Sequence, residues 1–595
     1  MAMSRTRKTI LIITTILGAL VLVALLGFAL LLGALGQREP NIRDNSVLVL
    51  RVAGPLPDYV PDDPLRKLLG GPDESLSNLI LQFRKAKSDK RIKAVILDIN
   101  MSGAGWAKSE EIRDAIADFR SSGKQVYAYM EFGLNKEYYI ASACDRIYLA
   151  PPGELFINGL AANVMFFRGS LDKLGVYPDI YQIGKYKSAG DTFTRKNMSE
   201  AHREYINSLL DDLFNRYVEA IAKARNKTPE EVRAIIDNSP YSALKAKEAG
   251  LIDSAAYRDE LDKEIKAKLG YKDTDQLRLV RGSEYREVPA ESLGLDKGER
   301  IAVIYATGEI GSGKSENSPT GDQSIGSDTV AKALNDARDD KTIKAIVLRV
   351  DSPGGSGLAS DIIWHAVEAA KQKKPVVVSM ADVAASGGYY IAASANKIIA
   401  QPSTITGSIG VVGGKPVMKG FYDWIGLSNE YVLRGKNAGM FRETEKFSPD
   451  ERAKFEEWIK TTYYNDFVPK VAKGRSKDPQ YIDSVGQGRV WTGSQGKDRG
   501  LVDEFGGLDR AVAVAQQLAN IPADKGVTRV ILPYPQTFLQ QLLNIGDTST
   551  EAQQQRAVFA ALPEDARRAL RYMRLLDQMK NGQSMLVMPF ELQIR

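Results

Sequence analysis

The chain repeats itself, and this internal duplication constrains its fold more than any other feature. Three pairs of segments match at a shift of 251 residues, or 250 near the end of the repeat: Arg91–Asn100 with Thr342–Asp351, Tyr138–Ile147 with Tyr389–Ile398, and Gly250–Asp253 with Gly500–Asp503. A shift that stays nearly constant over about 160 residues indicates a tandem pair of similar domains and not a short-period solenoid. A chain of 595 residues is also longer than one hydrophobic core usually organises.

Both copies show the pattern of a layered α/β domain. Short apolar runs rich in β-branched residues predict buried parallel strands, and stretches with helical periodicity follow them. The first copy has predicted strands at 94–99 and 125–130 and helices at 109–121 and 138–144; the second has strands at 345–350 and 375–380 and helices at 359–371 and 386–395. This alternation predicts two sheets covered by helices.

The limits of the repeat divide the chain into six predicted segments. They are the N-terminal residues 1–8, an apolar segment at 9–36, the first α/β repeat at 45–281, a polar linker at 282–299, the second α/β repeat at 300–535 and a helical tail at 536–595.

The apolar segment Thr9–Gly36 carries no charged residue and is predicted to be a transmembrane helix. At about 1.5 Å per residue it would span roughly 42 Å, more than the hydrocarbon core of about 30 Å, so we expect tilt or an interfacial end. Arg5, Arg7 and Lys8 precede it, and the positive-inside rule places the N-terminus in the cytoplasm and the rest of the chain outside. The alternative is a signal peptide cleaved near Ala34–Gly36, for which the apolar run is long.

The composition limits the possible partners and cofactors. The net charge of +6 comes from 80 basic and 74 acidic residues without a long basic stripe, so we expect no nucleic-acid partner. The chain has one cysteine, Cys144, and two histidines, His202 and His365. These numbers remove zinc sites that need two thiolates or a His-Glu-x-x-His spacing. We therefore expect neither a metal nor a cofactor.

Two glycine-rich motifs of the second copy fit the chemistry of acyl transfer. Ser408 lies in Thr406–Gly410, where flanking glycines permit the sharp backbone turn that exposes a nucleophile. Asp351–Gly355 follows a predicted strand and precedes a predicted helix, a place where backbone amides can stabilise an oxyanion. Taken alone, either motif is also compatible with an ordinary tight turn. Ser352 and Ser386 are competing serines, which we interpret as a turn residue and a helix N-cap.

A serine nucleophile needs a general base, and neither histidine is a good candidate for that role. His202 is predicted in the first turn of a surface helix and His365 on the face of another helix. Lys187 is the alternative, and small residues follow it. To act as a base it must be neutral, so burial must lower its pKa from about 10.4 to about 7–8. Without further evidence, a single lysine is more simply interpreted as a surface charge.

The duplication connects these two candidates. At the shift of 251 residues, Lys187 falls on Ala438 and Ser408 falls on Ile157. The first copy therefore has the lysine without the serine, and the second has the serine without the lysine. This complementary pattern predicts one site built across an interface between the copies, within one chain or between neighbouring chains.

The motifs resemble those of the signal peptide peptidase A family, also called protease IV, in its long duplicated form. The resemblance covers residues 45–535 and the N-terminal segment, and its specific parts are Gly184–Ala189, Asp351–Gly355, Ala385–Tyr390 and Thr406–Gly410. It implies tandem Clp protease/crotonase-like domains, with Ser408 as the nucleophile and Lys187 as the general base. One departure is Gly190–Phe193, where an acidic residue followed by Pro-Phe is expected.

The resemblance also implies where and on what such an enzyme works. By analogy with the fold, the amides of Ile409 and of Gly354 or Gly355 are expected to bind the oxyanion. The implied enzyme is a serine endopeptidase that degrades remnant signal peptides and other apolar peptides at the periplasmic face of the bacterial inner membrane. It is expected to be a homotetramer whose sites face an enclosed lumen. Two alternatives stay open: a crotonase-like acyl-CoA enzyme and a catalytically degenerate membrane scaffold.

Overall fold

The computed structural model describes residues 40–60, 74–272, 274–315, 323–533, 584–588 and 593–594, with a few isolated positions between Thr15 and Gly27. The predicted transmembrane segment 9–36, those isolated positions apart, and most of the predicted tail at 536–595 lie outside the described residues. Within the described part of the chain, no helix has both the length and the apolar character that a membrane crossing requires.

The first repeat folds around a largely parallel sheet with strand order β7-β4-β3-β2-β1-β9 and β8 beside β4. Its strands are β1 (Ser46–Gly54), β2 (Ile92–Ser102), β3 (Gln125–Gly133), β4 (Arg146–Leu155), β7 (Tyr241–Ser242), β8 (Ser254–Ala255) and β9 (Leu279–Arg281). In β2, Val95 and Leu97 enter one apolar cluster while Ala94 and Ile96 enter another on the opposite face. Burial on both faces explains why this strand is a continuous apolar run in the sequence.

Helices cover both faces of this sheet. One face packs against α3 (Leu76–Ser88), α4 (Trp106–Arg120), α5 (Asn135–Ala141), α8 (Glu200–Arg225), α9 (Pro229–Asp237), α10 (Ala243–Glu248) and α12 (Gly282–Tyr285), and the other against α11 (Arg258–Lys268). The predicted linker at 282–299 contains α12 and the 3-10 turn η1 (Ala290–Leu293). Tyr285 of this linker is fully buried, so the linker is packed against the first repeat.

The second repeat has the same plan, with strand order β19-β17-β15-β13-β10-β21, the short strand β16 beside β15 and the short strand β20 beside β16. Its strands are β10 (Glu299–Thr307), β13 (Ile343–Ser352), β15 (Val376–Ala385), β16 (Lys397–Ala400), β17 (Ile405–Gly407), β19 (Val490–Thr492), β20 (Glu504–Phe505) and β21 (Val527–Leu532). Its helices are α13 (Ser327–Asp339), α14 (Gly357–Lys371), α15 (Gly387–Ala392), α16 (Lys419–Ile425), α17 (Pro449–Lys460), the π-helical η2 (Thr461–Phe467), α18 (Val468–Arg475), α19 (Pro479–Val485), α20 (Gly493–Asp498) and α21 (Leu508–Leu518). The prediction of two mixed α/β repeats is confirmed.

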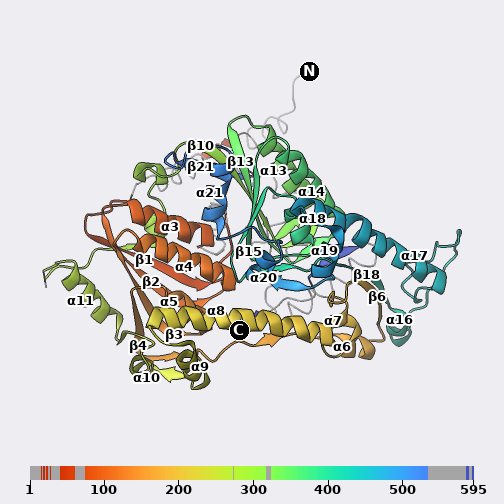
Figure 1. Cartoon of the computed structure of the whole chain (residues 1–595), viewed down its shortest axis with the longest axis horizontal. Coiled ribbons are helices and arrows are strands. Elements are labelled where there is room, and N and C mark those ends of the chain that lie inside the picture. Colours follow the sequence, from red (N-terminus) through yellow and green to blue (C-terminus); the bar gives the residue numbers. More distant parts are fainter. Residues whose placement is uncertain are drawn as a thin grey trace, which may run out of the picture.

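A third sheet joins the two repeats to the tail, in the order β12-β11-β14-β22-β18-β6. Its strands are β6 (Tyr177–Ile183), β11 (Glu309–Gly311), β12 (Ser324–Gly326), β14 (Gly354–Ser356), β18 (Val411–Val417) and β22 (Met585–Val587). Figure 1 shows α6 (Arg168–Lys173), β6 and α7 (Asp191–Thr194) of the first repeat beside β18 and α16 of the second, with α8 leading back to the first sheet. The first repeat thereby extends one segment into the second.

The described part of the tail differs from the helical prediction. Its residues form β22, in the third sheet, and β23 (Gln593–Ile594), which pairs with β5 (Ala162–Asn163) of the first repeat. The predicted tail helix lies outside the described residues. The short apolar run Met585–Val587 is a strand because strands of the second repeat satisfy its backbone on both sides.

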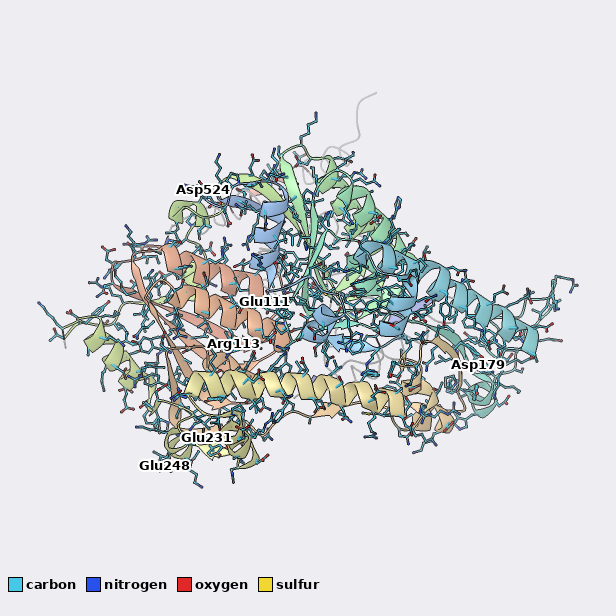
Figure 2. The ribbon with its side chains drawn as sticks, in the orientation of Figure 1. Glu111, Arg113, Asp179, Glu231, Glu248 and Asp524 are labelled. Atoms are coloured by element: carbon cyan, nitrogen blue, oxygen red, sulfur yellow. The ribbon has the colours of Figure 1, made fainter. Side chains whose placement is uncertain are left out.

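Buried charges also connect the repeats. Arg349 of β13 lies 2.8 Å from the carboxylate of Asp58 and 2.6 Å from that of Glu111, and all three side chains are buried. Figure 2 labels Glu111 near the middle of the molecule, on the α4 helix that faces the second repeat. Buried charges of this kind need partners, so this contact ties the relative position of the repeats to particular side chains.

Candidate active site

Lys187 reaches the second repeat on the loop that follows β6. The amide of Tyr186 donates to the carbonyl of Gln487 at 2.8 Å, which fixes this loop against the second repeat. Gly488, with φ of +74°, packs directly on it, because a Cβ on Gly488 would lie 2.4 Å from the Cβ of Lys187. A glycine is required there to let the two backbones approach so closely. The side chain of Lys187 is fully buried.

Ser408 lies in the sharp turn between β17 and β18. Its φ is +52°, a left-handed conformation that is rare for residues other than glycine, and Gly407 before it also has a positive φ of +81°. The amide of Ser408 donates to the carbonyl of Arg489 at 2.7 Å, and β17 is held between β15 and β19. The surrounding strands therefore stabilise a backbone conformation that is costly by itself.

The structure brings the two predicted residues together. The Nζ atom of Lys187 lies 3.1 Å from Ser408 Oγ, and it donates to Ser386 Oγ at 2.7 Å and to the carbonyl oxygen of Ser408 at 3.1 Å. Burial lowers the pKa of Lys187 well below its ordinary value. A neutral amine has two hydrogens and one lone pair. If both hydrogens are donated to Ser386 Oγ and the Ser408 carbonyl oxygen, the lone pair of a neutral Lys187 can accept from the Ser408 hydroxyl.

Ser386 is a site residue whose role the sequence did not reveal. The sequence predicts a helix N-cap at Ser386, and this residue does precede α15, but its side chain makes no capping hydrogen bond. Its hydroxyl instead accepts from Lys187, and its amide donates to the carbonyl of Gly407 at 2.8 Å. The contact depends on the pairing of β15 with β17, in which Ala385 lies opposite Gly407, and the sequence contains no signal for that register.

The glycine turn lies beside this centre. Ser352 has the turn role expected of it, since its hydroxyl accepts from the Gly354 amide at 3.2 Å. Gly354 and Gly355 have positive φ angles of +107° and +155° and form strand β14. The residue after the nucleophile, Ile409, is buried, and its carbonyl accepts from the Gly488 amide at 2.6 Å. Oxyanion binding by the amides of Ile409 and of Gly354 or Gly355 stays a prediction.

The two histidines lie elsewhere. His202 is in the first turn of α8 as predicted, but it is buried and not at the surface, because its ring stacks on Tyr205 with centroids 5.2 Å apart. Burial lowers the pKa of His202 to about 4, so its imidazole is neutral at physiological pH. His365 is exposed on α14. The side chain that contacts Ser408 Oγ is Lys187.

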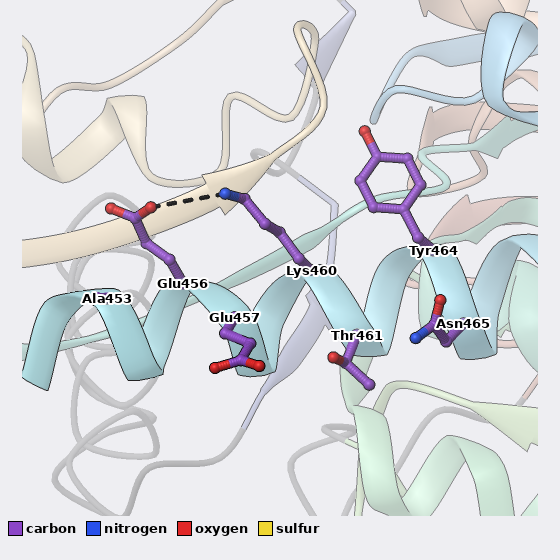
Figure 3. A pocket seen from close by; sticks show the side chains of 7 residues that line it. All are labelled: Ala453, Glu456, Glu457, Lys460, Thr461, Tyr464 and Asn465. Atoms are coloured by element: carbon purple, nitrogen blue, oxygen red, sulfur yellow. Dashed lines mark ion pairs between the residues drawn. The ribbon is translucent and has the colours of Figure 1, made fainter.

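A separate pocket of about 460 Å³ lies along α17 and η2. Figure 3 shows its lining, which comes entirely from one continuous helical stretch: Ala453, Glu456, Glu457, Lys460, Thr461, Tyr464 and Asn465. Glu456 and Lys460 form an ion pair at 3.7 Å within it. None of the predicted site residues lines this pocket, so it belongs to the outer surface of the second repeat.

Comparison with known proteins gives a consistent result for both repeats. Residues 118–272 and 368–522 each match Peptidase family S49. The chain is 39% identical over 506 residues to the chloroplastic serine protease SPPA of Arabidopsis thaliana, covering 85% of this chain and 74% of that protein. It is 33% identical over 575 residues to Protease 4 of Haemophilus influenzae, covering 91% of each. A solved ClpP1 mutant from Listeria monocytogenes is 16% identical, with a TM-score of 0.23 over 35% of this chain and 94% of that one, a likeness too weak to support a conclusion.

Proposed function

The chain belongs to peptidase family S49 and is a serine peptidase, and from this premise we propose that it cleaves apolar peptides with Ser408 as the nucleophile and Lys187 as the general base. The observation that carries the proposal is the 3.1 Å separation of Lys187 Nζ from Ser408 Oγ, with both side chains fully buried. Burial favours the neutral lysine that general-base catalysis needs.

The proposed reaction is an acyl transfer in two stages. Neutral Lys187 takes the proton of Ser408 as Oγ attacks the peptide carbonyl carbon, and backbone amides of Ile409 and of Gly354 or Gly355 stabilise the resulting oxyanion. Protonated Lys187 then gives its proton to the leaving amine as the C–N bond breaks. Water, deprotonated by Lys187, attacks the acyl-enzyme ester in the second stage, and Ser408 recovers its proton. No step uses a metal or a cofactor.

We place the substrates among remnant signal peptides and other apolar peptides at the periplasmic face of the bacterial inner membrane. An apolar peptide would exclude water from the buried lysine and so help to keep it neutral. The uncharged run at 9–36 would anchor the chain with its catalytic repeats outside the cytoplasm. Protection of the chain from an external protease in intact spheroplasts would contradict this orientation.

We propose further that copies of the chain assemble head to tail, as a tetramer, by repeating the contact between β6 and β18. Strand β6 at 177–183 corresponds by the duplication to residues 428–434, which are exposed. Strand β5 corresponds by the duplication to residues 413–414 of β18. Each of these two strands pairs with a strand of the tail: β5 with β23, and β18 with β22. Pairing 428–434 of one copy with β5 of the next would add a strand to the two-stranded sheet of β5 and β23 and repeat the β6–β18 arrangement there.

The dyad is tested by peptidase activity of the detergent-solubilised full chain on an apolar signal-peptide mimic. Ser408→Ala and Lys187→Ala are each expected to reduce kcat/KM by roughly a thousandfold or more, and the double variant should be little worse than either. Lys185→Ala is the matched control, since Lys185 is exposed two residues away, and it should keep the parental activity.

Three results decide between the alternatives. Loss of activity in both single variants, with labelling of Ser408 by a serine-reactive probe, supports the dyad. Retained activity in Lys187→Ala with loss in Ser408→Ala would move the base to another residue. Parental activity in both variants would contradict the dyad mechanism and favour the scaffold or acyl-CoA interpretation instead.

A further inference from the structure

A short segment of the second repeat contacts the backbone on both sides of the dyad. This segment, Gln487–Arg489, lies between α19 and β19. At one end, the Arg489 carbonyl accepts from the Ser408 amide at 2.7 Å. At the other end, the Gln487 carbonyl accepts from the Tyr186 amide at 2.8 Å. The segment therefore joins the backbone of the nucleophile to the loop that carries the lysine.

The side chain of Arg489 reaches the same lysine loop. The central carbon of its guanidinium lies 4.7 Å from the ring centroid of Tyr186 and 4.4 Å from that of Trp491. Tyr186 directly precedes Lys187 in the chain. A planar guanidinium that stacks on aromatic rings gains a favourable interaction and fixes the relative position of the groups. One residue thus holds the nucleophile through its carbonyl and the lysine loop through its side chain.

A carboxylate from the first repeat completes this arrangement. Glu204 of α8 accepts from the guanidinium of Arg489 at 2.6 Å and from the hydroxyl of Tyr186 at 3.1 Å. The hydrogen bond from Arg489 holds the pKa of Glu204 below its ordinary value, so the carboxylate is charged at neutral pH. Helix α8 packs against β19, since Tyr205 and Val490 lie in one apolar cluster. Arg489, Tyr186 and Glu204 therefore contact one another in a closed set, which we call the clamp.

The duplication shows that the fold does not need an arginine at this place. At the shift of 250 residues Arg489 corresponds to Ser239, and at the shift of 251 Ser408 corresponds to Ile157. The amide of Ile157 donates to Ser239 Oγ at 3.0 Å. This contact takes the place of the hydrogen bond between the Ser408 amide and the Arg489 carbonyl. The first copy therefore holds the equivalent turn without a guanidinium, and the arginine occurs in the copy that has the nucleophile.

We propose that Arg489 is a positioning residue for the dyad. Its guanidinium, held by Tyr186 and Glu204, keeps the lysine amine within hydrogen-bond distance of Ser408 Oγ. The inference rests on the proposed function, because it concerns the alignment of the proposed general base with the proposed nucleophile. It also gives the first repeat a second part in the reaction, since that repeat supplies Glu204 to the clamp as well as Lys187 to the dyad.

The test gives the second copy the residue that the first copy has. Arg489→Ser in the detergent-solubilised full chain should lower kcat on an apolar peptide roughly ten- to a hundredfold at nearly unchanged KM, because a small displacement of the lysine loop separates the base from the nucleophile. The matched control is Arg499→Ser. Arg499 also stacks on Trp491, at 3.7 Å, but its guanidinium donates to the carbonyl of Gln495, so both constants should keep their parental values.

The pH profile separates positioning from general damage to the fold. Of the described residues, Ser386 and Ser408 provide the polar atoms that contact Lys187 Nζ, and these atoms are uncharged, so burial is what lowers the pKa of the amine. A lysine loop released from the clamp admits water to the amine and raises this pKa. Loss of the Arg489 charge, which leaves Glu204 unpaired, acts in the same direction. The acidic limb of the kcat/KM profile should therefore move to higher pH in Arg489→Ser.

A double-mutant cycle tests whether the arginine acts through Tyr186. Tyr186→Leu removes the ring without changing the charge, and the double variant with Arg489→Ser should have a kcat close to that of the poorer single variant. Additive losses, a parental kcat in Arg489→Ser or an effect confined to KM would each overturn the proposal. So would a lower kcat and a lower unfolding temperature with the acidic limb in place, since that result makes the arginine merely structural. Failure of the proposed function would look different, because Ser408→Ala and Lys187→Ala would then match the parent.

Discussion

Ser386 Oγ lies 2.7 Å from Lys187 Nζ, closer than the 3.1 Å between that nitrogen and Ser408 Oγ. The lysine therefore has a fixed acceptor beside the serine that it is proposed to deprotonate. The orientation of the Lys187 amine depends on both hydroxyls, so Ser386 is a positioning residue for that amine.

Ser386→Ala is expected to lower kcat by roughly ten- to a hundredfold, because loss of this acceptor frees the amine to rotate away from Ser408. The hydroxyl also stabilises the protonated amine, so its removal should move the acidic limb of the kcat/KM profile to lower pH. A purely structural role would leave that limb in place. Ser394→Ala, another buried serine of the same repeat, is the control and should not change the profile.

The pH dependence of the parent enzyme should follow the protonation of Lys187. Because burial lowers the pKa of this lysine, kcat/KM should rise with pH and reach its plateau well below pH 10.5, the ordinary lysine pKa. Lys187→Arg should be inactive across the whole range, since a guanidinium stays protonated above pH 12. A Lys187→Arg enzyme with activity at neutral pH would show that the side chain is not the base.

The sequence predicted the contact between Lys187 and Ser408 better than it predicted the surroundings of these two residues. The first copy has the lysine without the serine, and the second has the serine without the lysine. This pattern links Lys187 to Ser408, and it is visible because the two copies can be compared with each other. The predicted strands at 94–99 and 345–350 were found within β2 and β13, since parallel strands buried on both faces are continuous apolar runs. These features can be predicted from local sequence patterns.

The missed features depend on long-range packing. Ser386 meets Lys187 across 199 residues of sequence, through a strand register that no local pattern specifies. Strand β22 is three residues long, too short for a periodic signal, and only its partners β14 and β18 make it a strand. His202 was predicted at the surface because the sequence does not show that Phe166 and Tyr205 enclose it.

The buried Lys187 should lower the free energy of unfolding of the protein. Below pH 10.5 the unfolded chain protonates this lysine before the folded protein does, so the free energy of unfolding falls as the pH decreases toward the folded-state pKa. Lys187→Met should therefore raise the free energy of unfolding at neutral pH by on the order of 2 kcal/mol. Urea unfolding at several pH values would measure this gain.

A second buried lysine is the control for that prediction. Lys85 is also buried, and burial lowers its pKa to about 8, but its Nζ donates to the carbonyls of Tyr285, Arg286 and Val288 at 3.0, 3.0 and 2.8 Å. Lys85→Met should destabilise the protein by about 1–3 kcal/mol, because these carbonyls lose their donor. Stabilisation by both substitutions, or by neither, would contradict this account of Lys187.

Lys108 lies 2.8 Å from Asp351 at the start of the glycine turn, 3.9 Å from Asp58 and 3.7 Å from Asp382. Burial opposes the charge of Lys108, yet these carboxylates raise its pKa above the ordinary value, so it stays protonated. Lys108→Met should cost about 3–5 kcal/mol of stability, because it removes the cation beside Asp351 and Asp382, whereas Asp58 keeps its contact with Arg349. It should also lower kcat, since Asp351 leads directly into Gly354.

A double-mutant cycle separates the ion pair from general damage to the core. Lys108→Met combined with Asp351→Asn should be more stable than the sum of the single effects predicts, by about 0.5–3 kcal/mol. Lys263→Met removes a pair with Asp259 whose side chains are 73% and 70% exposed, so it should change the free energy of unfolding by less than about 1 kcal/mol. Additive losses in the Lys108–Asp351 cycle would show that the contact between them does not hold the turn. The loss of activity in Lys108→Met would then have to come from the other carboxylates around it.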